Sequence, residues 1–123
     1  MRHEVTDADT AVALGSGDVP VLGTPRLIAW MEAATVRAAA GVLDPGQTTV
    51  GTAIRIEHRR ATTVGGGVEI TATAAGDIAG RRLTFDVIAV DDAGEVVGAG
   101  QIDRVIVDRN RFLEAAVGKR RTT

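Results

Sequence analysis

The chain lacks cysteine and tyrosine, and its only aromatic residues are Trp30, Phe85 and Phe112. The absence of cysteine excludes disulfides, thiolate metal ligands and a cysteine nucleophile. Single-stranded nucleic-acid binding relies on aromatic side chains that stack on bases, so the scarcity of aromatics weighs against it. The hydrophobic core therefore has to consist mainly of Ala, Val, Ile and Leu.

Neither sign of charge dominates, because 14 Lys and Arg residues stand against 16 Asp and Glu residues, for a net charge of −2. A strongly basic surface for duplex DNA is therefore absent. No apolar stretch approaches the ~20 residues that span a bilayer, and residues 1–7 lack the apolar region of a signal peptide. We expect a cytoplasmic protein without nucleic-acid or membrane partners. With two histidines and no cysteine, we also expect no metal and no other cofactor.

One long helix is expected within a single domain, residues 1–123. Thr24-Pro25 is a typical helix start, with Thr24 as the N-cap, and Gly41 is a typical end. Between them apolar residues recur every three or four positions, which predicts a buried helical stripe.

Strand patterns occupy most of the remaining chain. A short strand is expected within residues 3–14 and a longer one at 50–58. A third strand lies between the glycine turns at 65–67 and 76–80, and a fourth between the turns at 76–80 and 91–94. A fifth strand at about 95–107 precedes a short helix at about 109–117. In the strand at 50–58, alternation places Val50, Thr52, Ile54, Ile56 and His58 on one face. The prediction is an α+β fold with a five-stranded antiparallel sheet, whose open edges favour a homodimer.

Three residues are candidates for proton chemistry: Thr24, Glu32 and His58. A carboxylate and an imidazole are the usual proton-handling pair, and a hydroxyl can orient substrate or water between them. Glu32 lies about 80° around the helix from Thr24, at the margin of the buried stripe. Each residue also has a simpler interpretation: Thr24 as an N-cap, Glu32 as a rim carboxylate that pairs with Arg37, and His58 as an ordinary histidine at a strand end.

Gly51 is a candidate for substrate binding, because a glycine allows a carbonyl to approach the backbone N–H, as in an oxyanion hole. Its parity in the strand is opposite to that of His58, and a simple β-bulge is the interpretation that composition alone favours. Basic residues that could bind phosphates are Arg59, Arg60, Arg104 and the tail Lys119-Arg120-Arg121. Taken singly, such residues are usually solvated surface.

From Thr24 to Phe112 the sequence resembles the hotdog-fold acyl-CoA thioesterases, and most closely the fluoroacetyl-CoA thioesterase group. The similar segments are Met31-Glu32-Ala33-Ala34, Gly51-Thr52-Ala53-Ile54, His58 followed by Ala61-Thr62 and Gly65, Gly80-Arg81-Arg82-Leu83, and Asp103-Arg104. The resemblance implies a hotdog fold, in which an antiparallel five-stranded sheet wraps around one long central helix. It also implies homodimers, which could pair into tetramers, with active sites at the subunit interface.

The resemblance further implies hydrolysis of an acyl-CoA thioester by a triad of Thr24, Glu32 and His58. The Gly51 amide would bind the thioester carbonyl, and Arg104 would contact CoA. Whether Glu32 is a general base or a nucleophile stays open at this point. The alternative function is a non-catalytic module that binds acyl-CoA or another small apolar ligand.

Two segments depart from the family pattern. Thr63-Val64 stands where the family's histidine loop usually has a proline, and residues 18–22 lack the phenylalanine of the selective member's lid. The acyl group is therefore left open, with a more open pocket expected. A hotdog enoyl-CoA hydratase fits less well, because its aspartate–histidine loop motif is missing after Asp18.

Overall fold

The computed structural model describes residues 1–76 and 80–121, and the side chains of the basic tail from Lys119 onward lie outside the described part. Its elements are, in chain order, β1 (Arg2–Glu4), a 3-10 turn η1 (Asp7–Asp9), α1 (Ala11–Leu14), α2 (Thr24–Ala39), a 3-10 turn η2 (Ala40–Val42), β2 (Gln47–His58), β3 (Gly67–Ala74), β4 (Arg82–Asp91), β5 (Val96–Asp108) and α3 (Arg109–Arg121).

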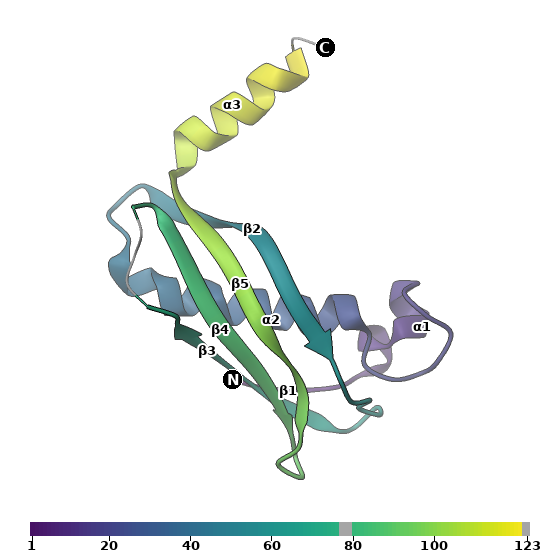
Figure 1. Ribbon diagram of the computed structural model, residues 1–123. Helices are drawn as coiled ribbons and strands as arrows, with labels where there is room; N and C mark the ends of the chain where they lie inside the picture. Colours follow the sequence, from purple (N-terminus) through teal and green to yellow (C-terminus); the bar gives the residue numbers. More distant parts are fainter. Residues whose placement is uncertain (77–79, 122–123) are drawn as a thin grey trace.

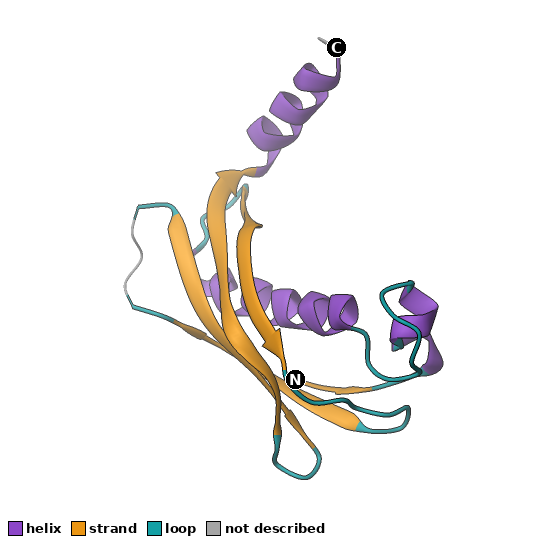
Figure 2. Cartoon of the chain, turned by 45° about the vertical axis from the view of Figure 1, so that its right-hand side comes forward, coloured by secondary structure: helices purple, strands orange, loops and turns teal. Residues whose placement is uncertain are grey.

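The five strands form one antiparallel sheet in the order β1-β3-β4-β5-β2. The sheet curls around α2, which lies across its concave face, while α3 projects away from the body (Figures 1 and 2). The expected α+β architecture with one central helix is confirmed. The short strand expected within residues 3–14 is present as Arg2–Glu4, and it is followed by η1 and α1, which the sequence did not predict. There Thr10 caps α1 by accepting a hydrogen bond from the Ala13 N–H.

The core lies between α2 and the concave face of the sheet. The apolar stripe of α2 buries Leu27, Met31 and Ala39 together with Thr35, against inward-facing residues such as Val68, Ile70, Phe85, Val87, Ala89 and Ile102. A Cβ at Gly98 would lie 3.0 Å from both a Leu27 methyl group and the Glu57 carbonyl oxygen. Glycine at this position therefore allows α2 to pack close to the sheet. No helix among the described residues is long and apolar enough to cross a membrane.

A β-bulge in β2 changes which residues face the helix. The register with β5 shifts between Gly51 and Ala53, so one extra residue, Thr52, is accommodated in β2. Before the bulge the odd-numbered Thr49 contacts the inward Arg104, whereas after it the even-numbered Ile56 packs against the core. Uniform alternation from Val50 to His58 was therefore a wrong prediction, since a one-residue shift exchanges the two faces.

Candidate active site

The first part of the site joins the start of α2 to the end of β2. Thr24 Oγ1 lies 2.8 Å from His58 Nδ1, a side-chain hydrogen bond between residues 34 positions apart. The N-cap of α2 is Gly23, and Thr24 is the first helical residue, followed by Pro25. The simpler interpretation of Thr24 as an N-cap is therefore wrong, and its hydroxyl is directed to the imidazole.

His58 is half-buried, and its surroundings keep the ring neutral near pH 7. Burial lowers the pKa of His58 below its ordinary value, because removal from water disfavours the charged imidazolium. The other ring nitrogen, Nε2, is buried and forms no hydrogen bond with the residues that the structure describes. Buried polar atoms are rarely unpaired, so this atom is a natural contact point for a ligand.

The second part of the site surrounds Glu32, two turns further along α2. The Arg104 Nη1 atom lies 3.4 Å from Glu32 Oε2. The same guanidinium donates from Nε to Thr49 Oγ1 at 2.8 Å and from Nη2 to the Thr49 carbonyl oxygen at 3.0 Å. The Arg104 side chain is only 7% exposed and that of Glu32 is 37% exposed. A buried cation thus fixes a carboxylate that still reaches solvent, instead of the pairing of Glu32 with Arg37 considered above.

Gly51 lies directly against this carboxylate. A Cβ at Gly51 would be 2.7 Å from Glu32 Oε2 and 3.4 Å from Arg104 Nη1. No side chain larger than hydrogen fits there unless Glu32 moves. The two interpretations of Gly51 are compatible, because the position begins a bulge and also faces the candidate carboxylate.

Within one chain the two parts are separate. Eight residues of helix separate Thr24 from Glu32, which corresponds to about 12 Å along the axis. Among the described side chains Glu32 pairs with Arg104, and no hydrogen bond links it to Thr24 or His58. The structure therefore brings together two members of the expected triad and places the third with Arg104.

The other expected basic residues divide into two groups. A cavity of about 310 Å³ beside Thr24 and His58 is lined by Arg59, Arg60 and part of the loop before α2. Both arginines are exposed, with exposed or half-exposed ion pairs from Arg59 to Glu57 and from Arg60 to Asp91. Arg104 is instead buried and bound inside the protein, a placement that does not suit contact with CoA. No cluster of metal-binding side chains occurs among the residues described.

Thr49 is the site residue that sequence reasoning missed. Its hydroxyl and its carbonyl both accept hydrogen bonds from Arg104. The predicted strand began at residue 50, and extending its alternation by one residue would have put Thr49 on the outer face. Only recognition of the bulge could therefore have revealed its role.

Fold and site together define a hotdog-fold protein with a carboxylate and a hydroxyl on its central helix and an imidazole at the end of β2. A hot-dog-like protein from Thermanaerovibrio acidaminovorans shares the fold at 24% identity, with a TM-score of 0.85 over 98% of this chain and 87% of that one. Within this class the chain belongs to the fluoroacetyl-CoA-specific thioesterase family, whose model matches residues 5–110.

Three relatives show how close this membership is. The fluoroacetyl-CoA thioesterase of Streptantibioticus cattleyicolor is 38% identical over 92 residues, which make up 75% of this chain and 65% of that protein. The solved structure of the fluoroacetyl-CoA thioesterase FlK is 30% identical, with a TM-score of 0.89 over 97% of this chain and 91% of that one. A mutant of that enzyme in complex with fluoroacetate and CoA has a TM-score of 0.88 over 97% and 96% of the two chains, also at 30% identity.

Proposed function

We propose that this protein is an acyl-CoA thioesterase whose active site uses Thr24, Glu32 and His58. The observation that carries the proposal is the 2.8 Å contact between Thr24 Oγ1 and His58 Nδ1. Helix capping does not require it, because Gly23 is the N-cap. Family membership supports the reaction, since the relatives named above hydrolyse a CoA thioester according to their names.

The Thr24 hydroxyl orients the imidazole of His58 through Nδ1 and suits the tautomer with its proton on Nε2. If the hydroxyl donates to Nδ1, a neutral imidazole carries its proton on Nε2, the atom that forms no hydrogen bond with the described residues. That N–H can donate to the sulfur of the leaving CoA as negative charge develops on it. Stabilising this charge is a transition-state interaction, so it accelerates the reaction and does not merely tighten binding.

Glu32 supplies the second half of the chemistry. As a general base, its carboxylate takes a proton from water while the water oxygen attacks the thioester carbon, and the Gly51 N–H stabilises the oxyanion. The C–S bond then breaks, and the proton held by Glu32 passes to the thiolate, which leaves a carboxylic acid and CoA thiol. In the nucleophilic route Glu32 attacks the thioester carbon and the C–S bond breaks, which releases CoA thiolate and leaves a mixed anhydride. Water then hydrolyses the anhydride to the free acid and the Glu32 carboxylate, and a proton from this water is available to the thiolate. Arg104 acts as a positioning residue in both routes because it holds the carboxylate beside Gly51.

A second protomer completes this site. Glu32 and His58 do not meet within one chain, and β2 is an edge strand whose described pairing is only with β5. An unpaired edge of 12 residues is a natural place for a second copy to add its own sheet. Ile54, a large apolar side chain of this strand, is 41% exposed. The proposal is therefore a homodimer, in which each site combines residues from both chains. A single domain over 1–123, pairing into tetramers and the cytoplasmic location stay predictions.

Arg59 and Arg60 are the proposed contacts for the phosphates of CoA, since exposed guanidinium groups pair well with phosphate oxygens. Both residues line the cavity beside Thr24 and His58. The loop segment that closes the cavity offers Val19 and Val21, without an aromatic side chain. The acyl group is therefore not restricted to fluoroacetyl by a phenylalanine, and the substrate class is stated as acyl-CoA.

Thiol release from a panel of short- to long-chain acyl-CoAs tests the function, and a disulfide dye provides a clean readout because the protein has no cysteine. Glu32→Ala is expected to lower turnover by about two orders of magnitude or more, with unchanged circular dichroism. Glu114→Ala, on α3, is the matched control. A folded protein that binds CoA but releases no thiol from any substrate contradicts the thioesterase and supports the ligand-binding alternative.

A further inference from the structure

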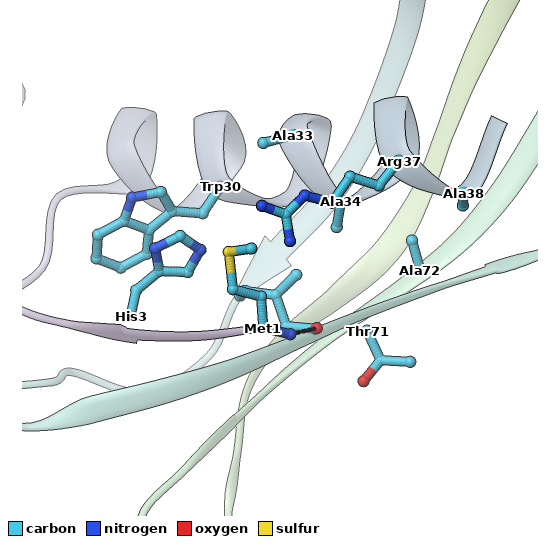
Figure 3. Close-up of a pocket in the computed structure, with 10 residues that line it drawn as sticks. Met1, His3, Trp30, Ala33, Ala34, Arg37, Ala38, Thr71 and Ala72 are labelled. Atoms are coloured by element: carbon cyan, nitrogen blue, oxygen red, sulfur yellow. Dashed lines mark hydrogen bonds between the residues drawn. The ribbon is translucent and has the colours of Figure 1, made fainter. Parts of the chain in front are cut away.

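A second cavity lies on the opposite side of α2 from Glu32. It has a volume of about 410 Å³ and is enclosed by α2, the start of β1 and the middle of β3 (Figure 3). Pockets of this size take small molecules. Trp30, which lines it, is about 160° around the helix from Glu32 at 100° per residue. The strands β1 and β2 form opposite edges of the sheet, so pairing through β2 leaves this cavity open.

The lining of this cavity is apolar with a single cationic side chain. The indole of Trp30 stacks on the imidazole of His3, with ring centroids 4.4 Å apart and planes 5° from parallel. Ala34 and Ile70 add aliphatic surface. Figure 3 shows the side chain of Arg37 extending along the helix toward this stack.

Arg37 gives the cavity its charge preference. No Asp or Glu lines the cavity, and Arg37 forms no ion pair or side-chain hydrogen bond with the described residues. A guanidinium offers two parallel donors that match a carboxylate. Burial lowers the pKa of His3, with the terminal ammonium of Met1 and then Arg37 as contributing charges, so near pH 7 its ring is neutral aromatic surface. The Met1 ammonium, which also borders the cavity, is paired with Glu69. Arg37 is therefore the cation left for a ligand, and one guanidinium next to apolar surface matches an anion with one carboxylate better than a ligand with several phosphates.

We propose that this cavity binds a small monocarboxylic acid with an apolar body. Its carboxylate pairs with the Arg37 guanidinium, and its hydrocarbon part lies against Trp30, Ala34 and Ile70. This is a binding site separate from the proposed active site, and it does not depend on thioesterase activity.

The protein carries its own reporter for this site. Trp30 is the only tryptophan and there is no tyrosine, so the intrinsic emission comes from the wall of the cavity. Octanoate is the probe, and octanamide, which has the same hydrocarbon body but no charge, is its matched control. We expect a saturable change in emission with octanoate and an affinity about tenfold or more weaker for octanamide, because a charge-assisted pair is lost.

Variants locate the binding. Arg37→Gln is expected to weaken octanoate binding by about tenfold while leaving octanamide binding unchanged, and Ala38→Leu, at the exposed rim, is expected to weaken both by filling the mouth of the cavity. Arg81→Gln, an exposed arginine outside this cavity, is the matched control and should bind as the parent does. Glu32→Gln should also bind normally, which separates this site from the active site.

Three results would overturn the proposal: no saturable change with octanoate in the folded parent protein, equal affinity for octanoate and octanamide, or loss of binding in Glu32→Gln with retention in Arg37→Gln. The comparison of the two ligands needs no mutation, so the test holds even if a variant fails to fold.

Discussion

Thr24 and His58 are 34 positions apart in the chain, yet Thr24 Oγ1 and His58 Nδ1 form a 2.8 Å hydrogen bond. Because Gly23 caps α2, Thr24→Val is expected to cost little stability, well below the ~1 kcal/mol typical of a lost N-cap. Turnover should fall, since Nδ1 loses the partner that orients the imidazole. Thr24→Ser, which keeps the hydroxyl, is the control. A large drop in melting temperature with unchanged kcat would show that Thr24 is structural.

The lowered pKa of His58 predicts how activity depends on pH. If neutral His58 is the active form, kcat/KM should rise with pH through an apparent pKa below the usual histidine value of about 6.5 and then level off. The acid limb should disappear in His58→Gln and persist in His3→Gln. NMR titration of the two rings, the only histidines in the chain, assigns the pKa. A limb unchanged in His58→Gln would remove the residue from the mechanism.

The lowered pKa of His58 also makes the free energy of unfolding depend on pH. Its folded-state pKa is lower than the unfolded value, so below about pH 6.5 the unfolded chain takes up the proton more readily. His58 should therefore stabilise the fold above that pH and lose this contribution as pH falls through the folded pKa. The pKa of His3 is also lowered chiefly by burial, so His3 changes stability with pH in the same direction. Measuring the free energy of unfolding in urea against pH for the parent, His58→Gln and His3→Gln separates the two contributions.

Arg104 should affect both stability and catalysis. Arg104→Met removes the donors that pair with Thr49 Oγ1, the Thr49 carbonyl and Glu32, and we expect the free energy of unfolding to fall by about 2–4 kcal/mol. Arg104→Lys cannot replace all three contacts and should lie in between. If Arg104 positions Glu32, kcat should fall more than KM rises in the Lys variant. A change confined to KM would instead support the direct CoA contact suggested by the family resemblance.

Gly51→Ala is a minimal change directed at Glu32. The added methyl group would sit 2.7 Å from Glu32 Oε2, so the carboxylate has to move. A displacement of this kind can lower turnover by about 100-fold, while an edge strand should tolerate alanine with little loss of stability. Gly41→Ala, where a Cβ meets nothing within 4 Å, is the control. Full activity in Gly51→Ala would show that neither the amide nor the Glu32 position is critical.

The sequence predicted the elements of this fold well because their signals are local. Thr24-Pro25 and Gly41 bracket α2 almost to the residue, and Gly65, Gly66 and Gly94 precede β3 and β5 as expected. The turn expected at 76–80 includes residues 77–79, which lie outside the described part of the chain. The orientation of residues in β2 was not predictable in the same way. The bulge at Gly51 depends on pairing with β5, a partner about 50 residues away, and alternation within β2 carries no sign of it.

The identity of the candidate site residues could be predicted from the sequence, but their spatial arrangement could not. Thr24, Glu32 and His58 follow from residue chemistry and from the family resemblance, but the burial of Arg104 and its bonds to Thr49 are tertiary facts. An arginine in a strand is ordinarily exposed to solvent. From the sequence, Arg104 was therefore expected to contact a phosphate. Only the packed sheet shows that it faces α2 and holds Glu32.

If two chains complete each thioesterase site, Glu32 of one protomer acts with His58 of the other, and a mixing experiment distinguishes this arrangement from a site within one chain. Glu32→Ala and His58→Ala homodimers should each release almost no thiol from the best acyl-CoA substrate. After unfolding and refolding as an equal mixture, random pairing places one intact site in half of the dimers, and about a quarter of the parent activity should return. If the mixture stays inactive although the parent refolds to full activity and size-exclusion chromatography shows mixed dimers, Glu32 and His58 do not act across the interface and the account is wrong.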